Sequence, residues 1–140
     1  TCHVATLTTA PAGTKINGDT FTIPSQLGSV TLHPYGDFLM HNVGTGDGIL
    51  QATREHYGHK VFQQMSGYLS KQDFESSRNK IRTAPLWGVR LRPRLMHDGT
   101  SLTFLDAIKR HRGEASNVTQ QFEKLKRPDQ EAIIEFLRSL

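Results

Sequence analysis

The sequence predicts a mainly α-helical domain that also contains a small β-hairpin and long loops. Three observations support this class: apolar residues recur at helical spacing near the C-terminus, a strong turn sequence separates two β-type runs near the N-terminus, and glycine and proline interrupt much of the rest. The chain has 140 residues, of which 36% are hydrophobic. A chain of this size buries roughly two thirds of its surface as one compact unit. We therefore expect a single domain over residues 1–140.

The hairpin is expected near the N-terminus, in a segment rich in threonine, glycine and proline. The β-type runs are Lys15-Ile16 and Thr20–Ile23, and Asn17-Gly18-Asp19 between them is a strong turn signal. A further β-type run covers residues 29–32.

The middle of the chain predicts a glycine-rich loop followed by a weak helix. Residues 36–48 read "GDFLMHNVGTGDG", and such a loop lets backbone approach a flat group closely. Partial periodicity indicates a helix over residues 49–69, which Gly58 and Gly67 weaken. Pro85, Pro93 and Gly99 then break the chain.

The C-terminal forty residues give the clearest helical signals. Thr103 followed three residues later by Asp106 is a variant capping box, so a helix should start there and end near Gly113. A second helix is expected over residues 117–126. Pro128 fits the first turn of a third helix, in which four apolar residues share one face: Ile133, Phe136, Leu137 and Leu140.

Composition excludes some classes of protein. No run approaches the ~20 apolar residues of a membrane helix, so we expect no membrane span. The single cysteine excludes an internal disulfide framework.

The net charge of +4 suits an acidic partner, and basic residues cluster at 78–94 and 109–112. Because these stretches lack aromatic residues for base stacking except Trp87, a solvated basic face is the more typical interpretation, and we expect no nucleic-acid partner.

The one cysteine lies at the start of the chain, directly before a histidine. Cys2-His3 has two interpretations: an incidental pair at a frayed terminus, or the end of a C-x-x-C-H haem attachment site whose first cysteine precedes the chain. In such a site the thiol adds across a haem vinyl group and the imidazole binds the iron.

His111 is a candidate second ligand. It lies seven, four and three residues after Phe104, Ala107 and Ile108, so it shares the apolar face of the expected helix. An imidazole on that face is either a core histidine bonded to a carbonyl or a haem ligand.

Other side chains with suitable chemistry are more dispersed. His97 lies in a turn before the cap, and Met96 could bind iron through its thioether or serve in packing. His41 lies in the glycine-rich loop. His56 and His59 could form half of a metal site, although a surface location is the more typical interpretation.

Five separated motifs together resemble a known family: "CHV", "HPYGDFLMHNVG", "IRTAPLWGVRLRPRLMHDG", "TFLDAIKRHRGEA" and "PDQEAIIEFLRSL". They are similar, in this order and over nearly the whole chain, to the C-terminal cytochrome c domain of the di-haem oxidoreductases. This family is also called the thiol oxidoreductases and is related to bacterial di-haem cytochrome c peroxidases. The resemblance implies a cytochrome c-like helical fold with one haem c, an iron cofactor.

The resemblance also implies roles for individual residues. Cys2 matches the second attachment cysteine, and His3 matches the proximal iron ligand. His111 occupies the distal position, where relatives have methionine or tyrosine, so iron with two histidine ligands is implied. The remaining cofactor-binding candidates are those near a haem edge or propionate in this interpretation: His41, Arg82, Trp87, Met96 and His97.

The implied function is electron transfer within a peroxidase-like oxidoreductase. The chain would be the C-terminal part of a longer protein with a second haem domain, periplasmic or otherwise outside the cytoplasm, with an acidic redox partner. Two features depart from the family pattern: the first attachment cysteine is absent, and Arg92 and Arg94 match positions near a calcium site of the peroxidases. The alternative is a haem-free basic module that binds nucleic acid or an acidic protein through Arg90, Arg92, Arg94 and residues 109–112.

Overall fold

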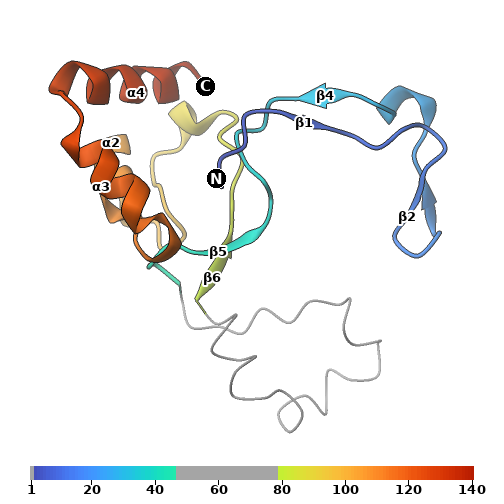
Figure 1. Cartoon of the computed structure of the whole chain (residues 1–140), viewed down its shortest axis with the longest axis horizontal. Coiled ribbons are helices and arrows are strands. Elements are labelled where there is room, and N and C mark those ends of the chain that lie inside the picture. The colour runs from blue at the N-terminus through green and yellow to red at the C-terminus, as the bar shows by residue number, and fades with distance from the viewer. Residues whose placement is uncertain (1, 47–78) are drawn as a thin grey trace, which may run out of the picture. The chain divides into compact units, whose positions relative to one another are not determined.

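The computed structural model describes residues 2–46 and 79–140, and these residues divide into two compact units (Figure 1). The first unit holds the residues up to Leu39 together with Thr83–Trp87. The second holds the described parts of Met40–Arg82 together with Gly88–Leu140. Each unit is considered by itself below.

The first unit is built from two short antiparallel strand pairs and one turn of 3₁₀-helix. Strand β1 (Leu7–Thr8) pairs with β4 (Thr31–Leu32), and β2 (Lys15–Ile16) pairs with β3 (Phe21–Thr22). The 3₁₀-helix η1 covers Ser25–Leu27. The β2–β3 pair confirms the predicted hairpin.

The hairpin turn forms because its residues tolerate left-handed backbone. Asn17, Gly18 and Asp19 have φ angles of 55°, 62° and 64°. Asparagine, glycine and aspartate are the residues that adopt this conformation most readily.

The interior of the first unit is small. Ile23 is 9% exposed, and Pro34 is among the most deeply buried side chains in the described residues. The segment after β6 joins this interior through backbone bonds, from Thr83 N to Leu39 O at 2.9 Å and from Leu86 N to Pro34 O at 2.9 Å. The first unit is therefore held together by residues that lie far apart in the sequence.

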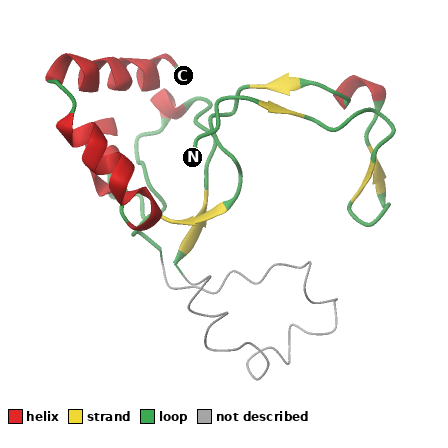
Figure 2. Ribbon diagram, in the orientation of Figure 1, coloured by secondary structure: helices red, strands yellow, loops and turns green. Residues whose placement is uncertain are grey.

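The second unit combines one strand pair with helices (Figure 2). Strand β5 (Met40–Asn42) pairs antiparallel with β6 (Lys80–Arg82), with His41 opposite Ile81. The helices follow in chain order: η3 (Val89–Leu91), α2 (Phe104–Arg110), η4 (Gly113–Ala115), α3 (Ser116–Lys124) and α4 (Arg127–Ser139).

The sequence signals for the start of a helix are confirmed at α2 and α4. Thr103 Oγ1 accepts a hydrogen bond from Asp106 N at 3.1 Å, which confirms Thr103 as the N-cap of α2. Pro128 lies in the first turn of α4. However, α2 ends at Arg110, earlier than predicted.

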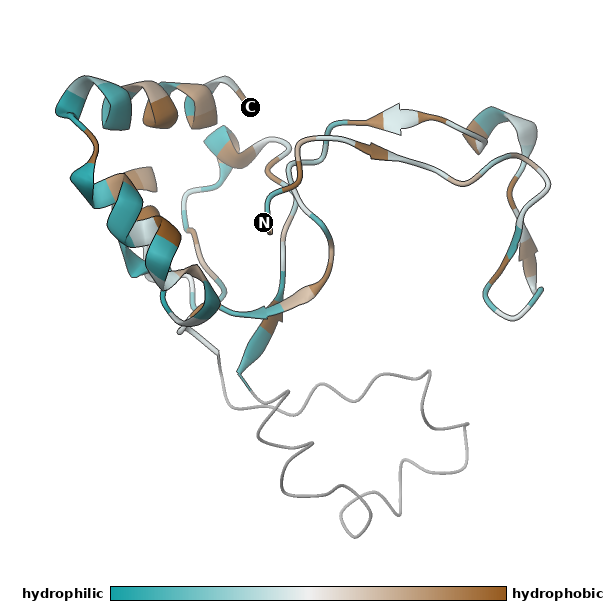
Figure 3. Cartoon of the chain, viewed as in Figure 1, coloured by the Kyte–Doolittle hydropathy of each residue, from teal (hydrophilic) through white to brown (hydrophobic). Residues whose placement is uncertain are grey.

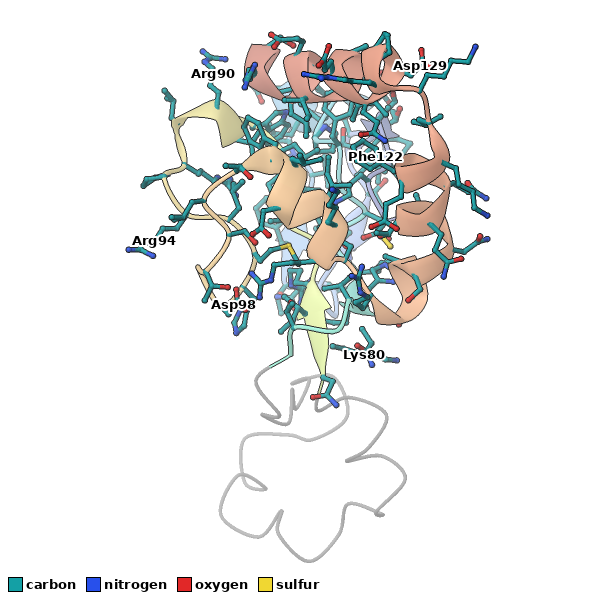
Figure 4. The ribbon with its side chains drawn as sticks, turned by 90° about the vertical axis from the view of Figure 1, so that its left-hand side faces the viewer. Lys80, Arg90, Arg94, Asp98, Phe122 and Asp129 are labelled. Carbon is teal, nitrogen blue, oxygen red and sulfur yellow. The ribbon has the colours of Figure 1, made fainter. Side chains whose placement is uncertain are left out.

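The core of the second unit is also limited. Val89, Ala107 and Phe122 are its buried apolar residues among those described, and Phe122 points from α3 toward the interior (Figure 4). Helix α4 buries none of its residues, although hydrophobic and hydrophilic residues alternate along the helix (Figure 3). Two residues of the predicted apolar face, Ile133 and Phe136, are 37% and 43% exposed.

The predicted mainly α, cytochrome c-like fold is wrong for the described part of the chain. Its α-helices have only 7, 9 and 13 residues, and three two-stranded sheets accompany them. The reason is that threonine, glycine and proline favour extended and turn backbone over most of the first forty residues, whereas strong helix formers are concentrated at the C-terminus. The helix predicted over 49–69, with His56 and His59, lies outside the described residues.

Among the described residues, no helix has the length and apolar character needed to cross a membrane.

Candidate functional site

The Cys2–Val4 segment is held by the chain around Tyr35. Asp37 N donates to Cys2 O at 2.9 Å, and Gly36 N donates to Val4 O at 3.0 Å. The imidazole of His3 adds a bond from Nδ1 to Tyr35 O at 2.8 Å. These contacts argue against the interpretation of Cys2-His3 as a frayed terminus, because backbone and side chain are both anchored. The Cys2 thiol is half-buried.

The bond to Tyr35 fixes where His3 carries its proton. A carbonyl oxygen only accepts hydrogen bonds, so Nδ1 must be the protonated nitrogen. In the neutral ring the lone pair then lies on Nε2. Metal-bound histidines are commonly oriented in this way, with the other ring N–H donated to a carbonyl or carboxylate.

The turn that accepts the His3 ring has unusual backbone geometry. Tyr35 and Phe38 have φ angles of 50° and 59°, values that bulky side chains rarely adopt. The nearby Trp87, half exposed, donates from Nε1 to His33 O at 2.7 Å. Strained backbone of this kind is found mainly where the surrounding structure holds a functional group in place.

His111 is the C-cap of α2 rather than a residue inside the helix. Its N–H donates to Ile108 O at 3.2 Å, and its Nδ1 bonds to Ala107 O at 2.7 Å. Its own carbonyl accepts from the hydroxyl of Thr119, a buried residue of α3, at 2.9 Å. The half-buried ring is thus anchored at its backbone and at one nitrogen.

The ring of His111 has the same proton arrangement as that of His3. Because Ala107 O can only accept, Nδ1 is protonated and Nε2 holds the lone pair in the neutral form. This is the bond that a core histidine would make, and it is also the bond that prepares Nε2 to bind a metal.

His41 is hydrogen-bonded to a glutamate that the sequence did not single out. His41 Nδ1 lies 2.9 Å from Glu114 Oε2, and Asn42 N donates to Glu114 Oε1 at 2.9 Å. These donors lower the pKa of Glu114, with the Asn42 backbone as the largest cause and the His41 ring second. Next to this pair, Arg112 N donates to Val43 O at 2.9 Å. The chain after His111 is therefore fastened to β5.

The turn formed by His97, Asp98 and Gly99 is connected to α2 by an ion pair. Asp98 accepts both terminal nitrogens of Arg110, and its Oδ1 also accepts Thr100 N at 3.1 Å. Arg110 NH1 further donates to the hydroxyl of Ser101, which is 0% exposed, at 2.7 Å. The Arg110 guanidinium is the main reason that the pKa of Asp98 falls to about 2. Asp98 lies at the edge of the unit in Figure 4.

The other predicted site residues fall in the same two units. Arg82 ends β6 opposite Met40, while Met96, with a φ of 65°, and the exposed His97 belong to the turn that Asp98 anchors. In the first unit are Cys2, His3 and Trp87; in the second are His41, Arg82, Met96, His97 and His111.

Sequence reasoning missed the residues that hold these candidates. Glu114, Arg110 and Thr119 looked like ordinary polar helix residues, and only the Asp98-Gly99-Thr100 order carried a local signal, that of an aspartate-stabilised turn. Their partners lie 8 to 73 residues away along the chain. No local pattern could have identified such pairs.

The alternative hypothesis of a basic binding module depends on arginines, and some of the arginines near its residues bond to other parts of the chain. A pocket of about 440 Å³ is lined by Arg90, Arg92 and Arg138 together with Leu95, Leu102 and apolar residues of α2 and α4. Arg90 NH1 donates to Ser139 O at 3.2 Å, and Arg138 pairs with Glu135. These contacts favour a structural role for two of the pocket's three guanidinium groups.

The described residues contain no cluster of three or more histidine, cysteine, aspartate or glutamate side chains that could hold a bare metal ion. Haem iron needs no such cluster, because the macrocycle supplies four ligands and the protein supplies only axial ones. An imidazole oriented through Nδ1, as at His3 in the first unit or at His111 in the second, therefore has the orientation that a haem ligand needs.

Comparison with known proteins agrees with this chemistry. The family described as di-haem oxidoreductase, putative peroxidase, has a model that matches residues 1–140. No curated protein and no solved structure matches the chain.

Proposed function

Because this chain belongs to the di-haem oxidoreductase family, we propose that it carries one haem c and transfers electrons, with His3 and His111 as the axial ligands. The family name gives haem as the cofactor and implies a second haem domain. The ligands, the covalent attachment and the electron-transfer role are our proposal.

The observation that carries the proposal is the shared orientation of two imidazoles. His3 and His111 each donate from Nδ1 to a backbone carbonyl, at 2.8 and 2.7 Å. Each bond leaves the lone pair of a neutral ring on Nε2, the atom that faces a metal in histidine sites of this type. The family motif positions selected the same two residues.

Exposed apolar side chains give further support. Leu39 and Trp87 in the first unit are 61% and 50% exposed, and Leu91 and Leu102 in the second are 77% and 67% exposed. Exposed apolar side chains mark a surface that binds an apolar group or another domain where they form a contiguous patch. A haem macrocycle or the second haem domain would remove such surface from water.

The proposed ligands define the chemistry of this part of the protein. Haem would supply a one-electron couple, and His3 and His111 would both hold its iron, which favours electron transfer over peroxide binding in this part of the protein. Any peroxidase reaction would then belong to the second haem domain. An acidic redox protein suits the charge of +4.

The first test concerns the cofactor and its attachment. The chain is produced in a host with a cytochrome c maturation system, and haem is measured by the pyridine haemochrome spectrum and by haem staining of a denaturing gel. Cys2 would form one thioether bond, so C2A should lose the stained band. A colourless wild-type protein would sink the haem proposal. Fractionation of the native host tests the proposed location outside the cytoplasm.

The second test concerns the ligands. H3A and H111A should each convert low-spin ferric iron to a high-spin form, because each would vacate one axial position. The matched control is H33A in the first unit, which should leave the spectrum unchanged. A low-spin spectrum in H111A would rule out His111 as the ligand.

A further inference from the structure

We infer that Glu114 is a positioning residue for His111 and acts together with His41 through the backbone of residues 111–114. The inference rests on the proposed function, since it takes His111 as an iron ligand. It assigns to the His41–Glu114 pair a role that the family match does not give.

The first step is the arrangement of donors around the Glu114 carboxylate. Each oxygen accepts one hydrogen bond from strand β5. Asn42 N donates to Oε1 and His41 Nδ1 donates to Oε2, both at 2.9 Å. Hydrogen bonds to an ionised carboxylate are stronger than neutral ones. The His41 side chain is 18% exposed, so its bond is partly shielded from water.

The second step is the chain between this carboxylate and His111. Arg112 N donates to Val43 O at 2.9 Å, and Gly113 has a φ of 57°. A β-carbon on Gly113 would collide with the carbonyl oxygen of Asn42. Glycine therefore lets residues 112–114 lie directly against β5.

The third step is the other side of His111. Its carbonyl accepts the Thr119 hydroxyl at 2.9 Å, and its N–H and ring nitrogen both bond within the last turn of α2. Residues 112–114 are also bonded to β5. The backbone at His111 is therefore held by contacts with three elements, α2, α3 and β5. An iron ligand must be held to within about half an ångström, so loosening one of these elements should weaken ligation.

The main experiment compares E114A with the matched control E123A, both in haem-loaded protein. Glu123 is an exposed glutamate of α3, whose substitution removes the same charge without touching β5. We expect E114A to show a mixture of high- and low-spin ferric haem at normal haem content, and E123A to stay low-spin. Equal spectra for E114A and wild type would overturn the inference, as would an equal change in E123A.

His41 supplies a rescue test that does not require removal of Glu114. H41N keeps an N–H donor near the position of Nδ1, whereas H41L has similar bulk and no donor. We expect H41L to resemble E114A and H41N to resemble wild type. Equal high-spin fractions in H41N and H41L would show that the hydrogen bond to Glu114 does not position His111.

A measurement on haem-free protein separates this inference from the proposed function. Hydrogen exchange at the Asn42 and Arg112 amides should become about tenfold faster or more in E114A, because a charge-assisted bond is lost. Unchanged exchange at both amides would refute the proposed effect of Glu114 on β5 and residues 112–114. If H111A stays low-spin, the ligand assignment fails instead, whatever the exchange rates show.

Discussion

At the scale of single residues, hydrogen bonds to three histidine rings determine the candidate site. The rings of His3 and His111 are oriented by carbonyls, and that of His41 by a carboxylate. The sequence identified all three histidines as candidates from their neighbours and from family motifs. It could not identify Tyr35 or Glu114 as their partners, because these lie 32 residues from His3 and 73 residues from His41.

The Asp98–Arg110 pair gives a prediction about pH. The folded pKa of Asp98, about 2, lies below the unfolded value of about 3.9. The folded state therefore gains stability from this carboxylate above pH ~4 and loses the gain as the pH falls toward 2. In urea unfolding, D98N should be less stable than wild type at pH 7, and the difference should shrink between pH 4 and pH 2.

The control for this prediction is D19N, in the exposed hairpin turn of the first unit, where asparagine also tolerates left-handed backbone. A difference between wild type and D98N that stays constant down to pH 2 would contradict the assigned role of Asp98.

At the scale of elements, local signals were predictable and pairings between distant segments were not. The β2–β3 hairpin and the Thr103 cap depend on residues within seven positions of each other, and both predictions were confirmed. The pairs β1–β4 and β5–β6 join segments 23 or more residues apart, and no local pattern specifies them. The α2 helix ends early because the His111 ring and backbone cap it.

The Gly113 turn gives a prediction at this scale. G113A should be more destabilising than G88A, although both glycines have left-handed backbone, with φ of 57° and 63°. The cost of left-handed backbone, roughly 1–2 kcal/mol, is common to both substitutions. Only Gly113 faces the Asn42 carbonyl, whereas a β-carbon on Gly88 meets nothing within 4 Å. Comparison of unfolding free energies measures the difference, and equal losses would refute the close approach.

At the scale of the whole molecule, the described residues form two units with small interiors. The predicted helical fold was wrong because fold class depends on how many elements pack together, whereas sequence periodicity reports only single elements. The predicted single domain stays a prediction. The family was nevertheless identifiable, because short motifs around Cys2, His97 and His111 carry chemical constraints that do not depend on the extent of helix.

Two small interiors lead to a prediction about the cofactor. A group that binds only the folded state stabilises it, and the proposed ligands are His3 and His111. The haem-loaded chain should therefore melt at a higher temperature than the wild-type chain produced without haem, with slower exchange at both the Gly36 and the Arg112 amides. Differential scanning calorimetry and hydrogen exchange measure these effects. Protection at one amide alone would restrict haem contacts to one unit.

The central claim is that His3 and His111 bind the same haem iron. Electron paramagnetic resonance of the ferric chain tests it most directly, because the spectrum separates low-spin iron with two axial imidazoles from high-spin iron. We predict a low-spin signal in the wild type and high-spin signals in both H3A and H111A. A high-spin wild type, or a low-spin signal that survives either substitution, would contradict the claim.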